Sequence, residues 1–481
     1  MKTPRAIVSW VMMVMLVGVA CPFILQAAMH QEEGDHQKMG IPADADPIHK
    51  TYIPVVTPDF ETIKAKDVEA KPRFDKRQQE LLKQRYDLSD TPSDIMMSAG
   101  RKAVQKGVRV KLPEGMTWEK LAATPPETIK AEGLFPEGFL PLPHSRHETG
   151  GQVIPQDHID EIMRLEKRDL ERFDTAMDLP KHFLPEFPPP IFLASRPDLG
   201  DVSQGKLLSI RNYYDIMNGI LTPVQMEGLR LLLTPFPQQQ FNQTDDRKVE
   251  EPSLGISCLD CHANGHTNGA FHLNPDTRPH IARFRLDTVS LRGLFNQQIH
   301  GSKRSLRSVE DFTEFEQRTA YFDGDHVTAA KKGANLPDRT SQVALMAQMQ
   351  NMFDFPPAPK LDVFGRLNPQ KATEMELKGE EVFFGKGRCA ECHPAPFYLD
   401  DKMHDLKLDR FYEPKMINGQ YNVAAGPIKS FTLRGIKDSP PYLHDGRCLT
   451  LEDTVEFFNL VTGVNLSKGE KEALVAFMRQ L

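Results

Sequence analysis

Two short strings carry the residues best suited to chemistry in this chain. They are Cys258-Leu-Asp-Cys261-His262 and Cys389-Ala-Glu-Cys392-His393, in a sequence with only six cysteines and sixteen histidines. Two thiols at this spacing can form thioethers to porphyrin vinyl groups, and the adjacent histidine can then bind the iron. A redox pair, coincidence or a zinc clip is the alternative, but zinc would leave both fused histidines without a role. The strings therefore predict two covalently attached haem c groups, with His262 and His393 as proximal ligands.

The segments that follow the two strings resemble each other. Ser290–Gly293, His300 and Ser308–Glu316 return as Thr432–Gly435, His444 and Thr450–Phe458. This repeated order indicates an internal duplication. Ser308 and Thr450 are predicted to be helix N-caps, because each precedes acidic residues that favour a first helical turn. Arg292 and Arg434 recur in both copies, and a guanidinium group is suited to pair with a haem propionate. For His444 we expect a similar propionate contact or a structural role.

Helical periodicity predicts the elements that position these residues. Apolar residues cluster within Gln156–Met177, and Thr222–Leu233 is a second helical stretch. A helix over Glu310–Gln317 follows the Ser308 N-cap, and Ser467-Lys-Gly-Glu470 is a capping box that begins a C-terminal helix. We therefore predict a mainly α fold with two cytochrome c-type haem domains, at residues 196–350 and 371–481. A proline-rich linker, residues 351–370, joins them.

The first 195 residues have a different character. Residues 1–27 contain Lys2, Arg5 and an apolar run, which is typical of a signal peptide and predicts export to the periplasm. A membrane anchor, or lipid attachment at Cys21, is the alternative. Residues 28–195 are polar and proline-rich, and we predict an irregular extension that wraps or caps the haem domains. The net charge of −7 provides no basic surface for nucleic acid.

Several strings resemble those of the bacterial dihaem cytochrome c peroxidase and MauG family. The most specific is Phe431-Thr-Leu-Arg-Gly-Ile-Lys-Asp-Ser-Pro-Pro-Tyr-Leu-His-Asp-Gly446, supported by Gly379–Gly385 and Phe397–Asp401. The resemblance covers roughly residues 205–481. It implies a peroxidase whose N-terminal haem reacts with hydrogen peroxide and whose C-terminal haem holds electrons from a small redox protein. A MauG-like enzyme that oxidises side chains of a partner protein is an alternative, as is a non-catalytic dihaem electron-transfer cytochrome. Family members are often dimers, which implies a homodimer.

The resemblance also implies roles for residues near the first haem. His280 resembles a removable distal iron ligand, although it could be a surface histidine, and His266 and His272 lie nearby. Cleavage of the O–O bond needs a carboxylate that moves a proton between the peroxide oxygens. Glu316 aligns with Phe458 in the duplication and is the first candidate for this carboxylate; Glu314 is the second. A solvated helix face is the alternative for both.

Three positions depart from the family pattern. Phe458 stands where the family has a Met or Tyr ligand, so the C-terminal iron either has five ligands or takes a sixth from Met403, His404, Met416 or Tyr421. The family's bridging tryptophan is missing, because the tryptophans are Trp10 and Trp118; the space could be filled by Phe295, His300 or Tyr321. The family's calcium ion would depend on Asp287, since a carboxylate suits calcium.

Overall fold

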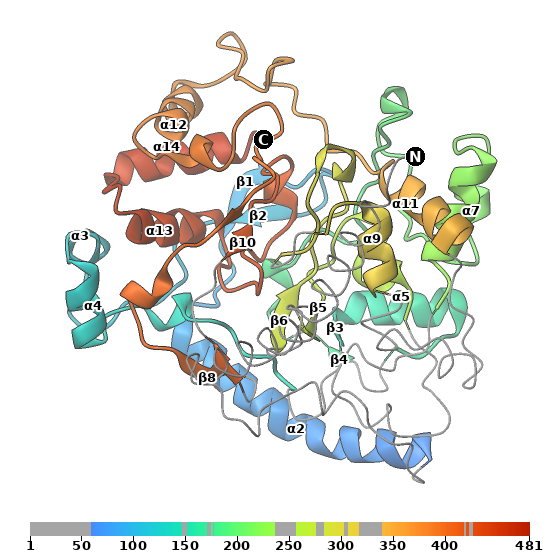
Figure 1. The fold of residues 1–481 in the computed structure, drawn as a ribbon, viewed down its shortest axis with the longest axis horizontal. Coiled ribbons are helices and arrows are strands. Elements are labelled where there is room, and N and C mark those ends of the chain that lie inside the picture. Colours follow the sequence, from blue (N-terminus) through green and yellow to red (C-terminus); the bar gives the residue numbers. More distant parts are fainter. Residues whose placement is uncertain are drawn as a thin grey trace, which may run out of the picture. The chain divides into compact units, whose positions relative to one another are not determined.

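The structure is a computed structural model, and it describes residues 59–146, 152–170, 175–176, 178–235, 256–275, 283–302, 306–316, 339–417, 420–422 and 427–481. Helices are its main regular elements, as the sequence predicts (Figure 1). The predicted signal peptide and Cys21 lie outside the described residues. Within the described part, no helix is both long and apolar enough to cross a membrane.

The helices are spread along the chain. They are α2 (Phe60–Arg85), α3 (Trp118–Ala122), α4 (Pro126–Glu132), α5 (Gln156–Glu166), α6 (Tyr213–Met217), α7 (Pro223–Leu232), α8 (Cys258–Cys261), α9 (Val309–Glu314), α11 (Ala344–Gln350), α12 (Glu374–Phe384), α13 (Leu451–Thr462) and α14 (Lys468–Met478). Short 3-10 turns follow each repeated Leu-Arg-Gly string, at Leu294–Asn296 and Ile436–Asp438.

The strands are short. They are β1 (Pro92–Met96), β2 (Ala103–Gln105), β3 (Gln152–Ile154), β4 (Thr175–Ala176), β5 (Phe271–Pro275), β6 (Arg283–Asp287), β7 (Met403–His404), β8 (Lys415–Ile417), β9 (Gln420–Asn422) and β10 (Ile428–Lys429). One sheet has four strands in the order β4-β3-β5-β6, with β3 parallel to β4 and the other pairs antiparallel. Segments before and after the first Cys-x-x-Cys-His string therefore share one sheet.

Buried apolar side chains form two separate clusters. The first is built by residues between Ile154 and Phe353, and it includes Leu259 and Cys261 of the first string. The second joins residues between Leu82 and Leu184 to residues between Leu367 and Leu481. Each Cys-x-x-Cys-His string thus has its own core, and the N-terminal part of the chain contributes to both cores.

The same helix pair occurs once in each core. Helix α7 packs on α11, and α12 packs on α14 (Figure 1). Both first helices begin with a capping box, at Thr222 and at Thr373, and both have a glycine at the crossing. A Cβ atom at Gly228 would lie 2.1 Å from the carbonyl oxygen of Leu345, and one at Gly379 would lie 1.9 Å from that of Ala473. Only glycine allows the helix backbones to approach this closely.

The local predictions for helix ends are confirmed. Ser308, Thr450 and Ser467 are N-caps whose side chains accept a backbone N–H, and Ser467 forms the predicted capping box. Helix α5 begins at Gln156 as predicted but ends at Glu166, because Lys167 adopts a left-handed conformation that terminates it.

The prediction of an irregular N-terminal extension is wrong at residues 60–85, where the structure has a long helix, whereas loops and short elements make up residues 86–146. Helix α2 runs through 26 residues, and its ends are stabilised by Asp59 at the N-cap and by basic residues in the last turn. Its buried face mixes Asp67 and Gln78 with Phe74 and Leu82. A face that is half polar gives little hydrophobic periodicity, so the pattern did not indicate this helix.

Candidate functional site: two haem-attachment loops and the cavity between them

The first string is arranged to present an imidazole to iron. Its cysteines lie on α8, and Nδ1 of His262 is 2.8 Å from the carbonyl oxygen of Val289. A carbonyl can only accept, so Nδ1 carries the proton and Nε2 keeps its lone pair. Burial lowers the pKa of His262 to about 4, so the ring is neutral at physiological pH. A neutral imidazole oriented by a carbonyl is the form that binds a metal.

The second string repeats this arrangement. Nδ1 of His393 is 2.9 Å from the carbonyl oxygen of Tyr398, and burial again lowers the pKa of His393. Burial raises the pKa of the Cys389 thiol to about 12. Both loops therefore hold a neutral histidine, with its Nδ1 held by a backbone carbonyl, beside protonated thiols, which is the donor set that haem c attachment requires.

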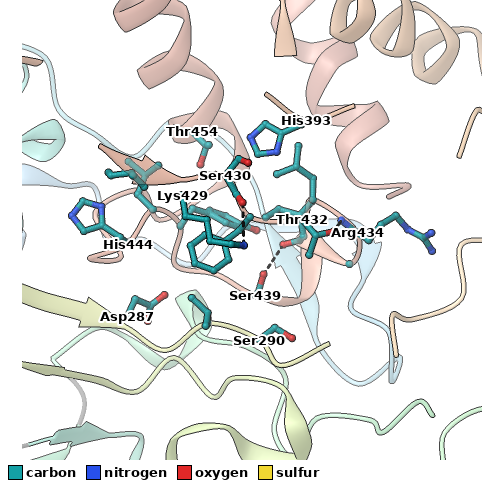
Figure 2. Close-up of a pocket in the computed structure, with 18 of the residues that line it drawn as sticks. Asp287, Ser290, His393, Lys429, Ser430, Thr432, Arg434, Ser439, His444 and Thr454 are labelled. Atoms are coloured by element: carbon teal, nitrogen blue, oxygen red, sulfur yellow. Dashed lines mark hydrogen bonds between the residues drawn. The ribbon is translucent and has the colours of Figure 1, made fainter. Parts of the chain in front are cut away.

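A cavity of about 250 Å³ opens beside the second string. Its wall is mainly apolar, and Cys392, His393, Phe458 and Met478 lie around it. Figure 2 shows His393 and Thr454 on one side of the cavity and Asp287 and Ser290 on the other. An apolar cavity lined by the Cys392 thiol and by a neutral imidazole fits a haem group.

The lining residues reduce the number of side chains that could be the sixth ligand of the iron predicted at the second string. Phe458 lines the cavity and has no donor atom, whereas His404 lines it with both ring nitrogens engaged. Nε2 of His404 is 2.8 Å from Asp400, and Nδ1 is 3.6 Å from the Cys392 sulfur. Met478 also lines the cavity, and its thioether is a ligand candidate that the sequence reasoning missed. Met403 does not line it, and the side chains of Met416 and Tyr421 lie outside the described part.

The proposed distal carboxylates of the first site lie at the end of α9. Glu314 is the last residue of the helix, Glu316 follows two residues later, and both side chains are half-buried. Burial, and then the charge of Glu316, raises the pKa of the Cys258 thiol to about 12. The Glu316 carboxylate is therefore within electrostatic range of the first string. The catalytic roles of Glu316 and Glu314 stay predictions.

The three histidines near the first string differ in position. His280 lies outside the described residues. Desolvation, followed by the proximity of His262, lowers the pKa of His272 to about 3. His266 connects the two halves of the site, with Nδ1 2.8 Å from the Ser290 hydroxyl and Nε2 3.0 Å from the carbonyl oxygen of Asp438. It also lines the cavity beside His393.

His266 thus connects the two halves of the site. In the sequence it is only one of two further histidines near His280. Of the residues expected between the sites, Phe295 meets Phe355 edge to face, with ring centroids 6.1 Å apart, and Phe355 stacks on Phe397 at 6.3 Å. His300 is buried, and Tyr321 lies outside the described residues. The feature of the sequence that could have indicated this role is the position of His266, four residues after His262.

The repeated arginines have different surroundings. Nη1 of Arg292 is 3.1 Å from Asp438, and Nη2 donates to the carbonyl oxygen of Pro190. Arg434 lines the cavity, and its Nε donates to the carbonyl oxygen of Leu481. Arg292 lines the same cavity. Binding of propionates by these arginines stays a prediction.

Asp287 lies on the wall opposite His393. Its side chain is half-buried, its buried Oδ1 has no hydrogen-bond partner, and desolvation raises its pKa well above the usual value. The described residues contain no group of three or more His, Cys, Asp or Glu side chains that could hold a metal ion. The calcium site at Asp287 therefore stays a prediction.

The structure corrects the alignment of the two repeats, in which His300 was matched to His444. Isolated bridges join His300 to Leu306 and Tyr442 to Cys448, each directly before a helix cap. The counterpart of His300 is therefore Tyr442. His444 is buried, lines the cavity, and accepts the N–H of Asp287 with its carbonyl oxygen at 2.9 Å.

The sequence is similar to known haem proteins. Cytochrome-c peroxidase IdrP2 of Denitromonas iodatirespirans is 30% identical over 25% of this chain and 43% of its own length. Methylamine utilization protein MauG of Methylorubrum extorquens is 28% identical over 21% of this chain and 27% of its own length. The chain spans less than half the length of these curated relatives. No protein-family model matches it.

Among solved structures, a MauG-like protein associated with microbial copper homeostasis is 16% identical over 55% of this chain and 90% of that protein, with a TM-score of 0.35. A score this low does not define the fold. The two attachment loops define a c-type cytochrome class of protein. The matched quarter of the chain is similar to cytochrome-c peroxidases and to MauG.

Proposed function

We propose that this chain is a periplasmic dihaem c-type peroxidase that reduces hydrogen peroxide with electrons from a small redox protein. The observation that carries the proposal is the repeated orientation of His262 and His393, each with Nδ1 held by a backbone carbonyl. Bound haem supplies the peroxide and electron-transfer chemistry. The chain supplies attachment, ligation and proton handling.

Two haem domains related by duplication form part of the same proposal. The two cores, the two glycine-containing helix pairs and the two capped helices α9 and α13 support it. We place the domains at residues 196–350 and 371–481, with the linker at residues 351–370. Cys258, Cys261, Cys389 and Cys392 would attach the haems.

Proton movement at the first site is assigned to Glu316, with Glu314 as the second candidate. A half-buried carboxylate can accept a proton from one peroxide oxygen and donate it to the departing oxygen. Reduction of one peroxide to two waters consumes two electrons and two protons. The proton that Glu316 would move between the two oxygens already belongs to the peroxide, so both consumed protons would come from solvent.

The remaining parts of the proposal are the environment and partners. The N-terminal sequence supports export, and Asp287 supports a calcium ion near the cavity. His280 is proposed as a removable ligand of the first iron. A homodimer is proposed from the resemblance alone.

A MauG-like oxidation of a partner protein is the second candidate function. The observation that favours it is Phe458. This residue lines the cavity beside the second string and has no donor atom, at a position where plain peroxidases have a ligand. A non-catalytic electron-transfer cytochrome is the third candidate and predicts that both irons have six ligands.

The first test is low-temperature EPR of the ferric protein, followed by peroxide turnover with a small reductant. A high-spin signal beside a low-spin signal, with turnover, would support a peroxide-accessible haem. Two low-spin signals and no turnover, even after partial reduction, would favour the electron carrier. Peroxide consumption without a small-molecule donor, with oxidation of an added protein, would favour the MauG-like function.

A further inference from the structure

The two Cys-x-x-Cys-His loops differ in how far they are covered. Asp260 lies between the cysteines of the first loop, and its side chain is 2% exposed. It receives hydrogen bonds from both terminal nitrogens of Arg168, at 2.6 and 2.9 Å. Arg168 follows α5, so it belongs to the N-terminal part of the chain. This part therefore covers the outer side of the first loop.

The second loop faces solvent. Glu391 occupies the position equivalent to Asp260, yet its side chain is 58% exposed and pairs with Arg388 at the surface. Pro394 and Pro396, which follow this loop, are also exposed. A protein partner can approach the second loop directly.

An exposed apolar turn lies against this second loop. Val363 is 86% exposed and Phe364 is 72% exposed, more than any other large hydrophobic residue among the described residues. The next residue, Gly365, packs so closely that a Cβ atom there would lie 2.8 Å from Cα of Pro396. The Tyr398 hydroxyl donates to the carbonyl oxygen of Gly365. Val363 and Phe364 are thus attached to the loop that contains His393.

The turn is held in one conformation before any partner binds. Oδ1 of Asp362 accepts the N–H groups of Phe364 and Arg366, both at 2.9 Å. The carbonyl oxygen of Asp362 accepts the N–H of Gly365 at 3.0 Å. A rigid aromatic side chain binds with a smaller entropy cost than a flexible one. Exposed aromatic residues with such support are typical of binding hot spots.

The charges around the turn are balanced. Residues 360–396 contain six Lys or Arg and six Asp or Glu. Several are paired within the chain, as in Lys360–Glu376, Arg366–Glu380 and Arg388–Glu391. A balanced surface complements an uncharged apolar face better than a strongly acidic or basic one.

We propose that Val363, Phe364 and the exposed second loop form the docking surface for a small redox protein with an uncharged apolar face around its cofactor. The direction of electron flow rests on the proposed function. One electron leaves the partner's cofactor, which is oxidised, and enters the haem site at His393, which is reduced; no atom is transferred. A small apolar contact suits the brief encounters of electron-transfer partners.

The test compares the V363S/F364S double variant with wild type and with a V68S control, all as holoprotein. Val68 is 55% exposed on α2 and serves as a matched exposed apolar residue. Reduced mitochondrial cytochrome c and a reduced blue copper protein are mixed with ferric protein by stopped flow, without peroxide. We expect the second-order rate constant to fall about tenfold in the double variant only. Reduction by dithionite should be equal in all three proteins.

The wild-type rate should change less than about twofold between roughly 20 and 200 mM salt, because the charges are balanced. Equal rates for the double variant and wild type, or no electron transfer to wild type from either probe, would overturn the proposal. So would a double variant that loses a homodimer in sedimentation but keeps its transfer rate. Because peroxide is absent, failure of the peroxidase function would leave this result unaffected.

Discussion

Arg292 and Asp438 form a buried ion pair between residues 146 positions apart in the chain. Nη1 of Arg292 lies 3.1 Å from Oδ2 of Asp438, and both side chains are 4% exposed. Oδ1 of Asp438 accepts the N–H of Ser98, and its backbone oxygen faces His266. Asp438 thus connects the N-terminal β1–β2 segment, the first attachment loop and the second half of the site.

Removing one partner of this pair should destabilise the protein strongly. Burial lowers the pKa of Arg292, yet no proton is lost at neutral pH, so an Asp438→Ala variant would leave a buried charge without compensation. We expect a loss of about 3–5 kcal/mol in the free energy of unfolding. The R292M/D438L double variant should recover most of it, as measured by urea unfolding. Equal stabilities for D438A and wild type would contradict the assignment.

The helix crossings predict matched effects at two distant glycines. Gly228→Ala and Gly379→Ala would each place a Cβ atom against a backbone carbonyl of the partner helix, which cannot move as a side-chain end can. We expect each to lower stability by about 1–3 kcal/mol. Gly469→Ala, on α14 with open space around it, is the control and should raise stability by about 0.5–1 kcal/mol. Thermal unfolding of the three variants checks this; three equal shifts would refute it.

Asp453 should make the stability of the contact between the N-terminal part and α13 depend on pH. Its Oδ1 accepts the N–H groups of Arg109 and Val110, at 2.6 and 3.0 Å, and burial raises its pKa to about 6. Because the folded pKa exceeds the unfolded one, protonation favours the folded state. This stabilisation is present below about pH 4 and is lost as the pH rises through about 6, and it amounts to roughly 3 kcal/mol.

An Asp453→Asn variant isolates this contribution, since an amide does not titrate. The difference in unfolding free energy, wild type minus variant, should fall by roughly 3 kcal/mol between about pH 4 and pH 7. Denaturant unfolding at several pH values measures it. A difference that rises with pH for Asp453→Asn would show the sign to be wrong.

If Glu316 is the carboxylate that moves the proton, its replacement should reduce peroxide chemistry specifically. Glu316→Gln keeps the size of the side chain but cannot move a proton, so kcat/KM for hydrogen peroxide should fall about 10²–10⁴-fold. Glu310→Gln, in the first turn of α9, is the control and should retain activity. Unchanged haem absorbance in both variants would show that attachment is intact. Full activity of Glu316→Gln together with loss in Glu314→Gln would transfer the role to Glu314.

The features that sequence predicted correctly depend on neighbours along the chain. The N-caps at Ser308 and Thr450 and the capping box at Ser467 each join residues three positions apart, so their hydrogen bonds are visible in the spacing. The attachment strings are equally local. In contrast, the half-polar buried face of α2 makes its contacts with distant segments, and its periodicity was too weak to indicate a helix.

By itself, the sequence determined which residues can attach haem and that their surroundings occur twice, because covalent attachment and helix capping are fixed by spacing of a few residues. Only the tertiary structure decided that Arg168 covers Asp260, that Arg292 meets Asp438, and that Phe364 stays exposed. The first two relationships join residues far apart in the chain. The third depends on which segments leave Phe364 uncovered. They follow from the burial of whole segments, which no local pattern specifies.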